Sequence, residues 1–311
     1  MNGIYHLRPV YKSFIWGGRK LITEFHLNPE LKNIGTIYSV IALPGHLDNV
    51  VEETGETLSE FYENHPELFR CKKGEFPVRM SITCNEGFQS YQLHPDDAYA
   101  LAHENTWGKV SGSVTLKEDE QVSEKLFGNK AASLDEFKAL VEKKDWESLF
   151  RKVKVKNGDF LHTPAGVIHG GYGDGSIYVA MGSNGDITYR FYDQDRNDPE
   201  RPLHLQEVYD CVTIPEVDLN ACVIHPTPVK KENLEILDYY SRPGEYIAKQ
   251  LRVNGTAEFE MEEFYCLANV GDEGLVNGQP LKKGETILVE REHGSIQLEG
   301  TMRLMLISYE D

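Results

Sequence analysis

Apolar and polar residues alternate in short runs along most of the chain, and glycine, proline or Asn-Gly pairs separate these runs. A period of two places apolar side chains on one face of a strand, so the pattern predicts a mainly β protein. The segment Phe76–Gln92 predicts a strand, a turn and a second strand. Further strands are expected at Ile34–Leu43, from Val153 onward, at Ile177–Met181 and at Ile187–Tyr192.

Two segments have the residue spacing of a helix N-terminus instead. Thr57–Glu60 has the spacing of a capping box, and it predicts a short helix that ends before Pro66. Ser133–Glu136 repeats that spacing and predicts a helix from Leu134 to about Lys144. A helical segment over 146–150 is expected to continue it, so we interpret 118–150 as a helical insertion.

The chain divides best into two β domains. Its 311 residues suffice for about two domains, and the Pro226–Pro228 stretch with its charged neighbours has the composition of a linker. We therefore predict an N-terminal domain over 1–225 and a smaller one over 235–311. Six short strands are expected in the second domain, at 246–253, 258–262, 265–270, 286–289, 295–298 and 303–308.

The segment Gly158–His169 predicts a strand, a tight turn and a second strand. Proline and glycine in Pro164-Ala165-Gly166 suit the turn, and His169 follows it directly. In a small β-barrel this placement aims the imidazole inward. The spacing resembles the second cupin motif, Gly-x5-Pro-x-Gly-x2-His. An ordinary hairpin with a structural histidine is the alternative.

A matching half of a site lies upstream, in the run Tyr91–Asp97. Gln92 and His94 are two residues apart, so on a strand both side chains point to one face. An amide oxygen and an imidazole that face the same point can bind a divalent metal. His94 could instead cap the turn at Pro95.

Composition and charge narrow the functional classes. The net charge of −18 disfavours nucleic acid and anionic membrane as partners. Five scattered cysteines without a Cys-x-x-Cys pair suit a reduced, cytoplasmic protein, and no apolar run approaches the length of a membrane-spanning helix. We expect a protein that binds a small molecule, as a monomer or a homodimer.

Four motifs together resemble the short bacterial type of class I mannose-6-phosphate isomerase: Trp16–Gly18, Gln92–Asp97, Gly158–His169 and Thr188–Arg196. The resemblance implies two cupin-type jelly-roll β-barrels with a small helical insertion. It also implies a zinc-dependent enzyme that interconverts mannose 6-phosphate and fructose 6-phosphate. By the same resemblance Gln92, His94 and His169 match three of the four metal ligands, and Arg190 matches the active-site arginine.

The substrate phosphate of such an isomerase needs cationic partners. Arg190, Arg196, Lys109 and Lys156 are the candidates, and arginine suits bidentate contact with phosphate. Arg190 could alternatively form an ion pair with Asp193 or Asp195. The reaction also needs a base at C2 of the sugar. His162, Asp96 and Asp97 are the nearby titratable groups, and the sequence does not choose among them.

Several positions depart from the family pattern. The fourth ligand is expected to be a glutamate in a Gly-Lys-Thr-Glu context, but this chain has Ser111 there. Ser81 replaces an expected lysine, and Thr36–Ser39 replaces an expected Glu-Ser-Trp-Glu. His162 is the main candidate to substitute for the missing ligand, if its strand parity is inward; Glu104 is a weaker one.

Two functions from different classes remain. The first is a metal-dependent sugar-phosphate isomerase, which the retained ligands and Arg190 favour. The second is a catalytically weak or inactive relative that binds a sugar or sugar phosphate, which the loss at Ser111 favours. A cupin oxygenase is disfavoured, because glutamine replaces one histidine of the His-x-His pattern of such an enzyme.

Overall fold

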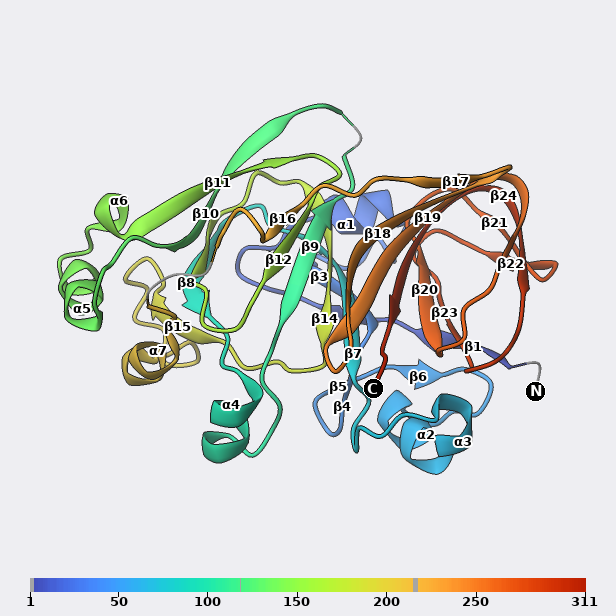
Figure 1. The fold of residues 1–311 in the computed structure, drawn as a ribbon, viewed down its shortest axis with the longest axis horizontal. Helices are drawn as coiled ribbons and strands as arrows, with labels where there is room; N and C mark the ends of the chain where they lie inside the picture. Colours follow the sequence, from blue (N-terminus) through green and yellow to red (C-terminus); the bar gives the residue numbers. More distant parts are fainter. Residues whose placement is uncertain (1–2, 118, 215–217) are drawn as a thin grey trace.

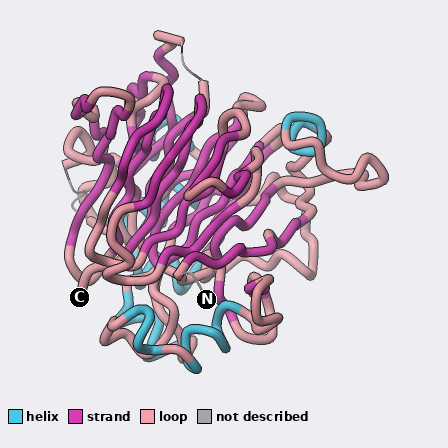
Figure 2. The backbone as a smooth tube through the Cα atoms, turned by 90° about the vertical axis from the view of Figure 1, so that its right-hand side faces the viewer, coloured by secondary structure: helices cyan, strands magenta, loops and turns pink. Residues whose placement is uncertain are grey.

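A computed structural model describes residues 3–117, 119–214 and 218–311 (Figure 1). Within these ranges strands hold 43% of the residues and helices 14%, and most strands belong to three large antiparallel sheets, which confirms the mainly β prediction. Figure 2 shows the strands gathered through the middle of the molecule and the helices toward its margins. None of the helices in these ranges is long and apolar enough to span a bilayer.

Two of the sheets are built from the first three-quarters of the chain. In the described ranges a five-stranded sheet has the order β11 (Phe150–Lys156), β10 (Val122–Asn129), β13 (His169–Tyr172), β8 (Phe88–Leu93) and β15 (Tyr189–Tyr192). A seven-stranded sheet has the order β16 (Val223–Ile224), β12 (Phe160–Thr163), β9 (Ser111–Thr115), β14 (Ile177–Ser183), β7 (Val78–Cys84), β3 (Thr36–Val40) and β2 (Val10–Lys12). A small separate ribbon pairs β4 (Ala42–Leu43) with β5 (Leu47–Asp48).

The third sheet contains most of the C-terminal residues. Its main path, among the described strands, is β17 (Val229–Lys231), β18 (Leu234–Arg242), β19 (Tyr246–Phe259), β24 (Ile296–Ser308), β20 (Tyr265–Asn269), β23 (Thr286–Val289), β1 (Ile4–Arg8) and β6 (Val50–Val51). β21 (Gly274–Val276) joins it beside β24 and carries β22 (Gln279–Leu281). This ten-stranded sheet lies on the right in Figure 1, where β1 runs into it from the N-terminus.

Helices are short in the described ranges. They are α1 (Lys20–Glu24), α2 (Leu58–Asn64), α3 (Pro66–Phe69), α4 (Asp97–His103), α5 (Leu134–Glu142), α6 (Trp146–Leu149) and α7 (Leu205–Cys211). The capping box at Thr57 and Glu60 is present as predicted. At Ser133 the cap also forms, but Glu136 accepts from the backbone N–H of Ala132 rather than from that of the cap residue.

The segment interpreted as a helical insertion is part strand and part helix. β10 occupies 122–129 and pairs with β11 and β13, so only α5 and α6 are helical. Residue 118, at the start of the expected insertion, lies outside the described residues. Apolar side chains of the helices, including Phe137, Val141 and Leu149, pack with Phe150 and Phe191 of the five-stranded sheet.

The ten-stranded sheet draws on both ends of the chain. β1 pairs with β23 over four residue pairs, from Ile4 opposite Val289 to Leu7 opposite Thr286. The expected division into domains over 1–225 and 235–311 did not anticipate this pairing of residues near the N-terminus. That division therefore stays a prediction, with β1 lying in the sheet of the C-terminal part.

Two long strands replace four of the short strands expected near the C-terminus. β19 runs without interruption over the expected break after Val253, and β24 does so over the break before Arg303. The glycines at these breaks, Gly255 and Gly300, are opposite each other in the ladder with φ of +121° and +116°. Because glycine adopts this backbone conformation without steric cost, both strands continue through the expected breaks and the ladder keeps its register.

One apolar core joins the seven-stranded and ten-stranded sheets. Met80 and Ile82 of β7 lie in it together with Met305 and Ile307 of β24. A second core, which includes Leu251, Leu267 and Leu304, is made by the ten-stranded sheet alone. The seven-stranded sheet thus has one face buried in apolar contacts, which leaves its other face free to line a cavity.

Candidate active site and metal centre

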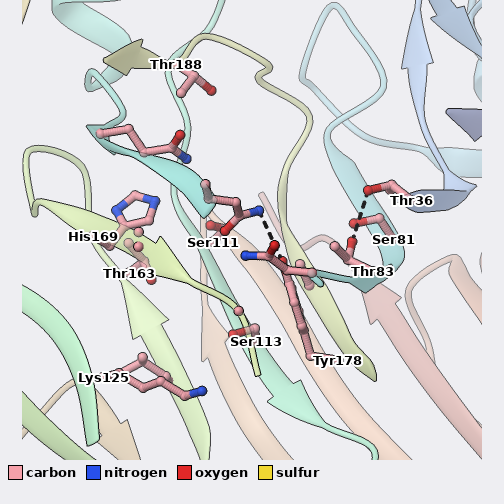
Figure 3. Close-up of a pocket in the computed structure, with 18 of the residues that line it drawn as sticks. Thr36, Ser81, Thr83, Ser111, Ser113, Lys125, Thr163, His169, Tyr178 and Thr188 are labelled. Atoms are coloured by element: carbon pink, nitrogen blue, oxygen red, sulfur yellow. Dashed lines mark hydrogen bonds between the residues drawn. The ribbon is translucent and has the colours of Figure 1, made fainter. Parts of the chain in front are cut away.

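A cavity of about 400 Å³ lies between the five-stranded and seven-stranded sheets. Side chains from both sheets line it, and most of them are polar. Figure 3 shows Ser81, Ser111, Ser113 and Thr163 among the labelled residues around this space. A volume of this size lies within the usual range for sites that bind small molecules.

The seven-stranded sheet forms the floor of the cavity, in three rows that cross its strands. The first row contains Arg79, Gly182, Ser111 and Thr163. The second contains Tyr38, Ser81, Ala180, Ser113 and Leu161. The third contains Thr36, Thr83, Tyr178 and Thr115. Every one of these residues except Gly182 lines the cavity. The floor therefore consists mostly of small side chains, many of them hydroxyl-bearing, and it is almost uncharged.

Three of the departures from the family pattern lie on this floor. Ser111, Ser81 and Thr36 occupy the first, second and third rows in turn. Each faces the cavity, because alternate residues of one strand share a face of the sheet. The sequence differences therefore change one surface together, and they replace expected charged groups with hydroxyls.

The predicted ligands come from the opposite sheet and meet at one place. β8 carries Gln92 and is followed directly by His94, and β13 begins at His169. Gln92 is opposite His169 in the ladder between the two strands, and the rings of His94 and His169 have centroids 5.0 Å apart. All three side chains line the cavity, as the shared parity of Gln92 and His94 predicted.

Both imidazoles are held by the backbone through one nitrogen. Nδ1 of His94 is 2.8 Å from the carbonyl oxygen of Ile187, and Nδ1 of His169 is 3.0 Å from that of Val167. A carbonyl can only accept, so each Nδ1 is the protonated nitrogen and each Nε2 keeps a free lone pair. Burial lowers the pKa of His94 well below its ordinary value and that of His169 to about 4. Both rings are therefore neutral, as metal ligands must be.

The amide of Gln92 is oriented by a neighbour on the same strand. The Ser90 hydroxyl donates a hydrogen bond of 2.8 Å to Oε1 of Gln92. This fixes which end of the amide is the oxygen, and that oxygen has a second lone pair available. Two imidazole nitrogens and one amide oxygen thus form a set of three uncharged donors.

No carboxylate completes this set in the described part of the chain. Among those residues no group of three or more His, Cys, Asp or Glu side chains is placed to hold a metal. Ser111 lines the cavity where the family pattern has its glutamate ligand. A serine hydroxyl carries no charge near neutral pH, so it does not replace the carboxylate.

His162 does not reach the cavity, so the expectation that it supplies a fourth ligand is corrected. Its neighbours Leu161 and Thr163 line the cavity, and strand alternation turns His162 to the opposite face. There its Nδ1 is 3.0 Å from the Tyr246 hydroxyl and its ring stacks on Tyr240. The weaker candidate, Glu104, is exposed outside the cavity and accepts a hydrogen bond from a tyrosine hydroxyl.

Lys109 is one of three cations, with Lys12 and Arg190, that line the cavity without an ion pair in the described ranges. Its backbone N–H donates to the carbonyl of Pro95, which places Lys109 beside the segment that carries His94. Burial, together with the nearby Arg79 guanidinium, lowers the pKa of Lys109 to about 7. Its amine can therefore exist in both protonation states near neutral pH.

Arg190 is another of these three cations. The carboxylates with which it could have paired are engaged elsewhere: Asp193 with Arg196 and Arg201, and Asp195 with Lys144. The Nε of Arg190 is buried and has no hydrogen-bond partner within the described residues. An arginine that lines a cavity with a donor left over is suited to bind an anionic ligand.

The other two predicted phosphate contacts lie outside the cavity lining. Arg196 is engaged with Asp193, Gln194 and the carbonyl of Phe88, where it holds the loop after β15. The side chain of Lys156 is 44% exposed and pairs with Glu120. Neither side chain is placed to contact a ligand in the cavity, so both are removed from the expected set.

Sequence reasoning missed an ion pair at the first row of the floor. Arg79 is 8% exposed, and its Nη1 is 2.8 Å from Oδ1 of Asp186 and bonds to the carbonyl of Gly185. Asp186 in turn helps to keep Lys109 protonated. The alternating run from Val78 to Thr83 held a signal, because it places one charged residue on the polar face of a buried strand.

The fold and the donor set define a cupin-type protein whose cavity can hold a metal and an anionic ligand. Curated relatives match almost the whole chain. "Probable mannose-6-phosphate isomerase GmuF" of Bacillus subtilis is 31% identical over 96% of this chain and 97% of its own length. Mannose-6-phosphate isomerase ManA of the same organism is 30% identical over 94% and 95%. A scan of protein-family models gave no match.

The chain belongs to the mannose-6-phosphate isomerase family. The crystal structure of the Bacillus subtilis mannose 6-phosphate isomerase superimposes with a TM-score of 0.89 at 28% identity, and it covers 98% of this chain and 99% of its own. The apo form of the Salmonella typhimurium enzyme has a TM-score of 0.76 at 14% identity with full coverage of both chains, and this shows the shared fold alone. Isomerases of this family are generally metal-dependent.

Proposed function

We propose that the protein is an aldose–ketose isomerase that interconverts mannose 6-phosphate and fructose 6-phosphate. The relatives that match nearly the whole chain carry this name. The observation that carries the proposal is the meeting of Gln92, His94, His169 and Arg190 in one cavity. Three oriented donors beside an unpaired arginine suit the anionic oxygens of a sugar phosphate.

The donors fit one divalent ion, and we infer zinc. Nε2 of His94, Nε2 of His169 and Oε1 of Gln92 would hold it, since each has a free lone pair and a second contact that fixes its orientation. When bound, such an ion polarises the sugar oxygens at C1 and C2 and stabilises negative charge there. The remaining steps are assigned to side chains of this protein.

Lys109 is the group we assign to proton transfer. An aldose–ketose shift removes a proton from C2 and returns one to C1, and a group with a pKa near the working pH does this best. Lys109 faces the cavity with a pKa lowered to about 7, so its Nζ can take and give back that proton. Asp96 caps α4 and Asp97 accepts from the N–H of Gly108, and neither lines the cavity.

Arg190 is the group we assign to the negative charge of the substrate. Its guanidinium lines the cavity and keeps its charge at any physiological pH. Contact with the developing charge on the sugar oxygens would lower the barrier more than it strengthens ground-state binding. Lys109, when protonated, would add to the same attraction.

A coupled assay tests the proposal. Purified protein loaded with zinc is given mannose 6-phosphate, and formation of fructose 6-phosphate is followed with an auxiliary enzyme. Turnover that is lost in His169→Ala and in Arg190→Met is the expected result. A zinc-loaded wild-type protein that shows no turnover over the background rate would contradict the proposal.

A second function is favoured by one observation, the uncharged floor. Ser111, Ser81 and Thr36 remove expected charges from all three rows, so the cavity could bind a sugar phosphate and catalyse little. Calorimetric binding of mannose 6-phosphate by a protein with no isomerase turnover would establish this alternative.

We further infer that the protein is cytoplasmic and that it is a monomer or a homodimer. Sedimentation of the purified chain would distinguish the two oligomeric states.

A further inference from the structure

The three proposed metal donors carry no negative charge, and no unengaged carboxylate lines the cavity in the described part of the chain. The amide of Gln92 has no charge, and Nδ1 of His94 and of His169 faces a backbone carbonyl, so each ring offers the lone pair of Nε2 as an uncharged donor. Three carboxylates line the cavity in the described ranges, and each is engaged elsewhere: Asp159 with His225, Asp174 with the N–H of Ser176 and with Lys125, and Asp186 with Arg79. A divalent cation at the three donors would keep its full charge of two.

The surroundings of the donors are positive instead. Arg190 and Lys109 face the same cavity and form no ion pair within the described residues. A guanidinium repels a divalent cation that neutral ligands hold beside it. A partly buried site screens this repulsion only weakly. The same site favours any anion that can lie between the metal and the guanidinium.

The floor beside the donors has room for such an anion. Serine has the shortest polar side chain of any residue type, so Ser111 fills little of the space above it. Its cross-strand neighbours in the first row are Gly182 and Thr163. In the view of Figure 3, Ser111 lies between the ring of His169 and the hydroxyls of Ser81 and Thr83. The Nε of Arg190 adds a buried donor that has no acceptor among the described residues.

We propose that the metal binds this protein together with a small oxyanion, which takes the place of a fourth, negatively charged ligand. The anion would occupy the space over Ser111, with one oxygen toward the metal and another toward Arg190. Carboxylate and phosphate oxygens both have the required chemistry, and an anionic oxygen of the sugar phosphate itself belongs to the same class. The inference rests on the proposed metal site and not on catalytic turnover.

The physical consequence is cooperative binding of the two ions. Each ion lowers the electrostatic cost of the other, so the affinity for metal rises with anion concentration. By linkage the affinity for the anion must rise with metal by the same factor. A site completed by its own carboxylate would show neither effect, because its negative charge is always present.

Calorimetric titration of the full-length chain tests this with zinc and with formate, a carboxylate small enough for the space over Ser111. We expect formate to raise the zinc affinity by at least about tenfold, or about 1.4 kcal/mol, and zinc to raise the formate affinity equally. Acetamide, a neutral analogue, is expected to leave the zinc affinity unchanged. Mannose 6-phosphate in place of formate then asks whether the substrate supplies the anionic oxygen.

Two variants with the same added charge locate the effect. Ser111→Glu puts a carboxylate in the first row, and it should bind zinc tightly with little further gain from formate. Ser113→Glu puts it one row farther from the donors on the same strand and face, and it should keep the formate dependence of the wild type. Arg190→Met should lose most of the formate effect while it keeps the three donors. Folding of each variant is checked by thermal unfolding before titration.

The possible outcomes distinguish failure of the anion inference from failure of the isomerase proposal. Zinc affinity that is equal with and without formate in the wild-type protein would overturn the inference, and so would a wild-type protein that binds zinc under neither condition. If Ser111→Glu fails to fold, the reciprocal titration of formate and the Arg190→Met variant still decide. Turnover of mannose 6-phosphate is measured separately, so an inactive protein that shows cooperative binding would refute the isomerase proposal alone.

Discussion

The imidazole rings of His94 and His169 lie with their centroids 5.0 Å apart, and a backbone carbonyl holds Nδ1 of each. The two residues are 75 positions apart in the chain, and the pairing of β8 with β13 brings them together. Their Nε2 atoms are therefore presented to one cavity before any metal arrives. Such pre-arranged ligands need little reorganisation on binding.

Zinc binding should depend on these two histidines and not on His162. We expect His94→Ala or His169→Ala to lower zinc affinity by more than the roughly 100-fold that outer-shell partners contribute. His162→Ala should leave zinc affinity unchanged, because its side chain faces Tyr246. Zinc content after dialysis, with formate present, is the measurement. Loss of zinc in His162→Ala at unchanged thermal stability would show that the ring reaches the cavity.

The same His162 should make the fold sensitive to acid. Burial lowers its pKa from 6.5 to about 4, so between these values the unfolded chain binds a proton that the folded chain does not. The free energy of unfolding must therefore fall as the pH is lowered from about 6.5 to about 4. A lowering of this size corresponds to about 3 kcal/mol from this residue.

His162→Phe isolates that contribution. Phenylalanine can keep the stacking on Tyr240 but has no titratable nitrogen. Urea unfolding at pH 7 and at pH 4.5 should show a smaller loss of stability for the variant than for the wild type. The variant is expected to be less stable at pH 7, since the Tyr246 hydroxyl loses a partner. Equal losses in the two proteins would mean that His162 does not titrate in this range.

Local patterns predicted the parts of the site that depend on local geometry. Gln92 and His94 share a face because they are two apart, and Pro164 and Gly166 place His169 after a turn. The parity of His162 was open, because the turn between β12 and β13 breaks the alternation that would relate it to His169. Only the register of β12 against β9, with Thr163 opposite Ser111, decides which face His162 takes.

Long-range strand pairing is the part of the fold that could not be predicted from the sequence. The mainly β class followed from alternation, and capping spacing predicted the start of α2. Nothing in residues 4–8 indicated that β1 would pair with β23, about 280 positions later. The ion pair of Arg79 with Asp186 has the same origin, since it spans more than 100 positions. Such contacts depend on the assembled sheets, and local sequence does not encode them.

Arg190 should contribute far more to turnover than Lys156, although the sequence made both residues candidates for contact with the substrate phosphate. We expect Arg190→Met to lower kcat/KM for mannose 6-phosphate by about 10²–10³, the usual loss when one donor to developing charge is removed. Lys156→Met should leave kcat/KM within about twofold, because Lys156 lies outside the cavity lining and pairs with Glu120. Steady-state kinetics with zinc and formate present measure both. A similar loss in the two variants would show that Arg190 makes no special contact with the developing charge of the substrate.

The N-terminal part should fail to fold without the C-terminal part, although the linker suggested two independent domains. In the full chain β1 pairs with β23, and one apolar core contains Leu7 and Phe160 together with Tyr239 and Met305. A fragment of residues 1–225 would expose this core and leave β1 without its partner. We expect no cooperative thermal transition for the fragment by circular dichroism, and no zinc binding.

A nick tests the same relationship without removing residues. A protease site inserted within Pro226–Pro228 leaves both sheets complete after cleavage, so the two pieces should elute together and keep most of the stability of the intact protein. The comparison separates a loss of contacts from a loss of covalent connection, since only the fragment loses contacts. A fragment of residues 1–225 that unfolds cooperatively and binds zinc as the intact chain does would establish an independent N-terminal domain, and the pairing of β1 with β23 would then be dispensable for the site.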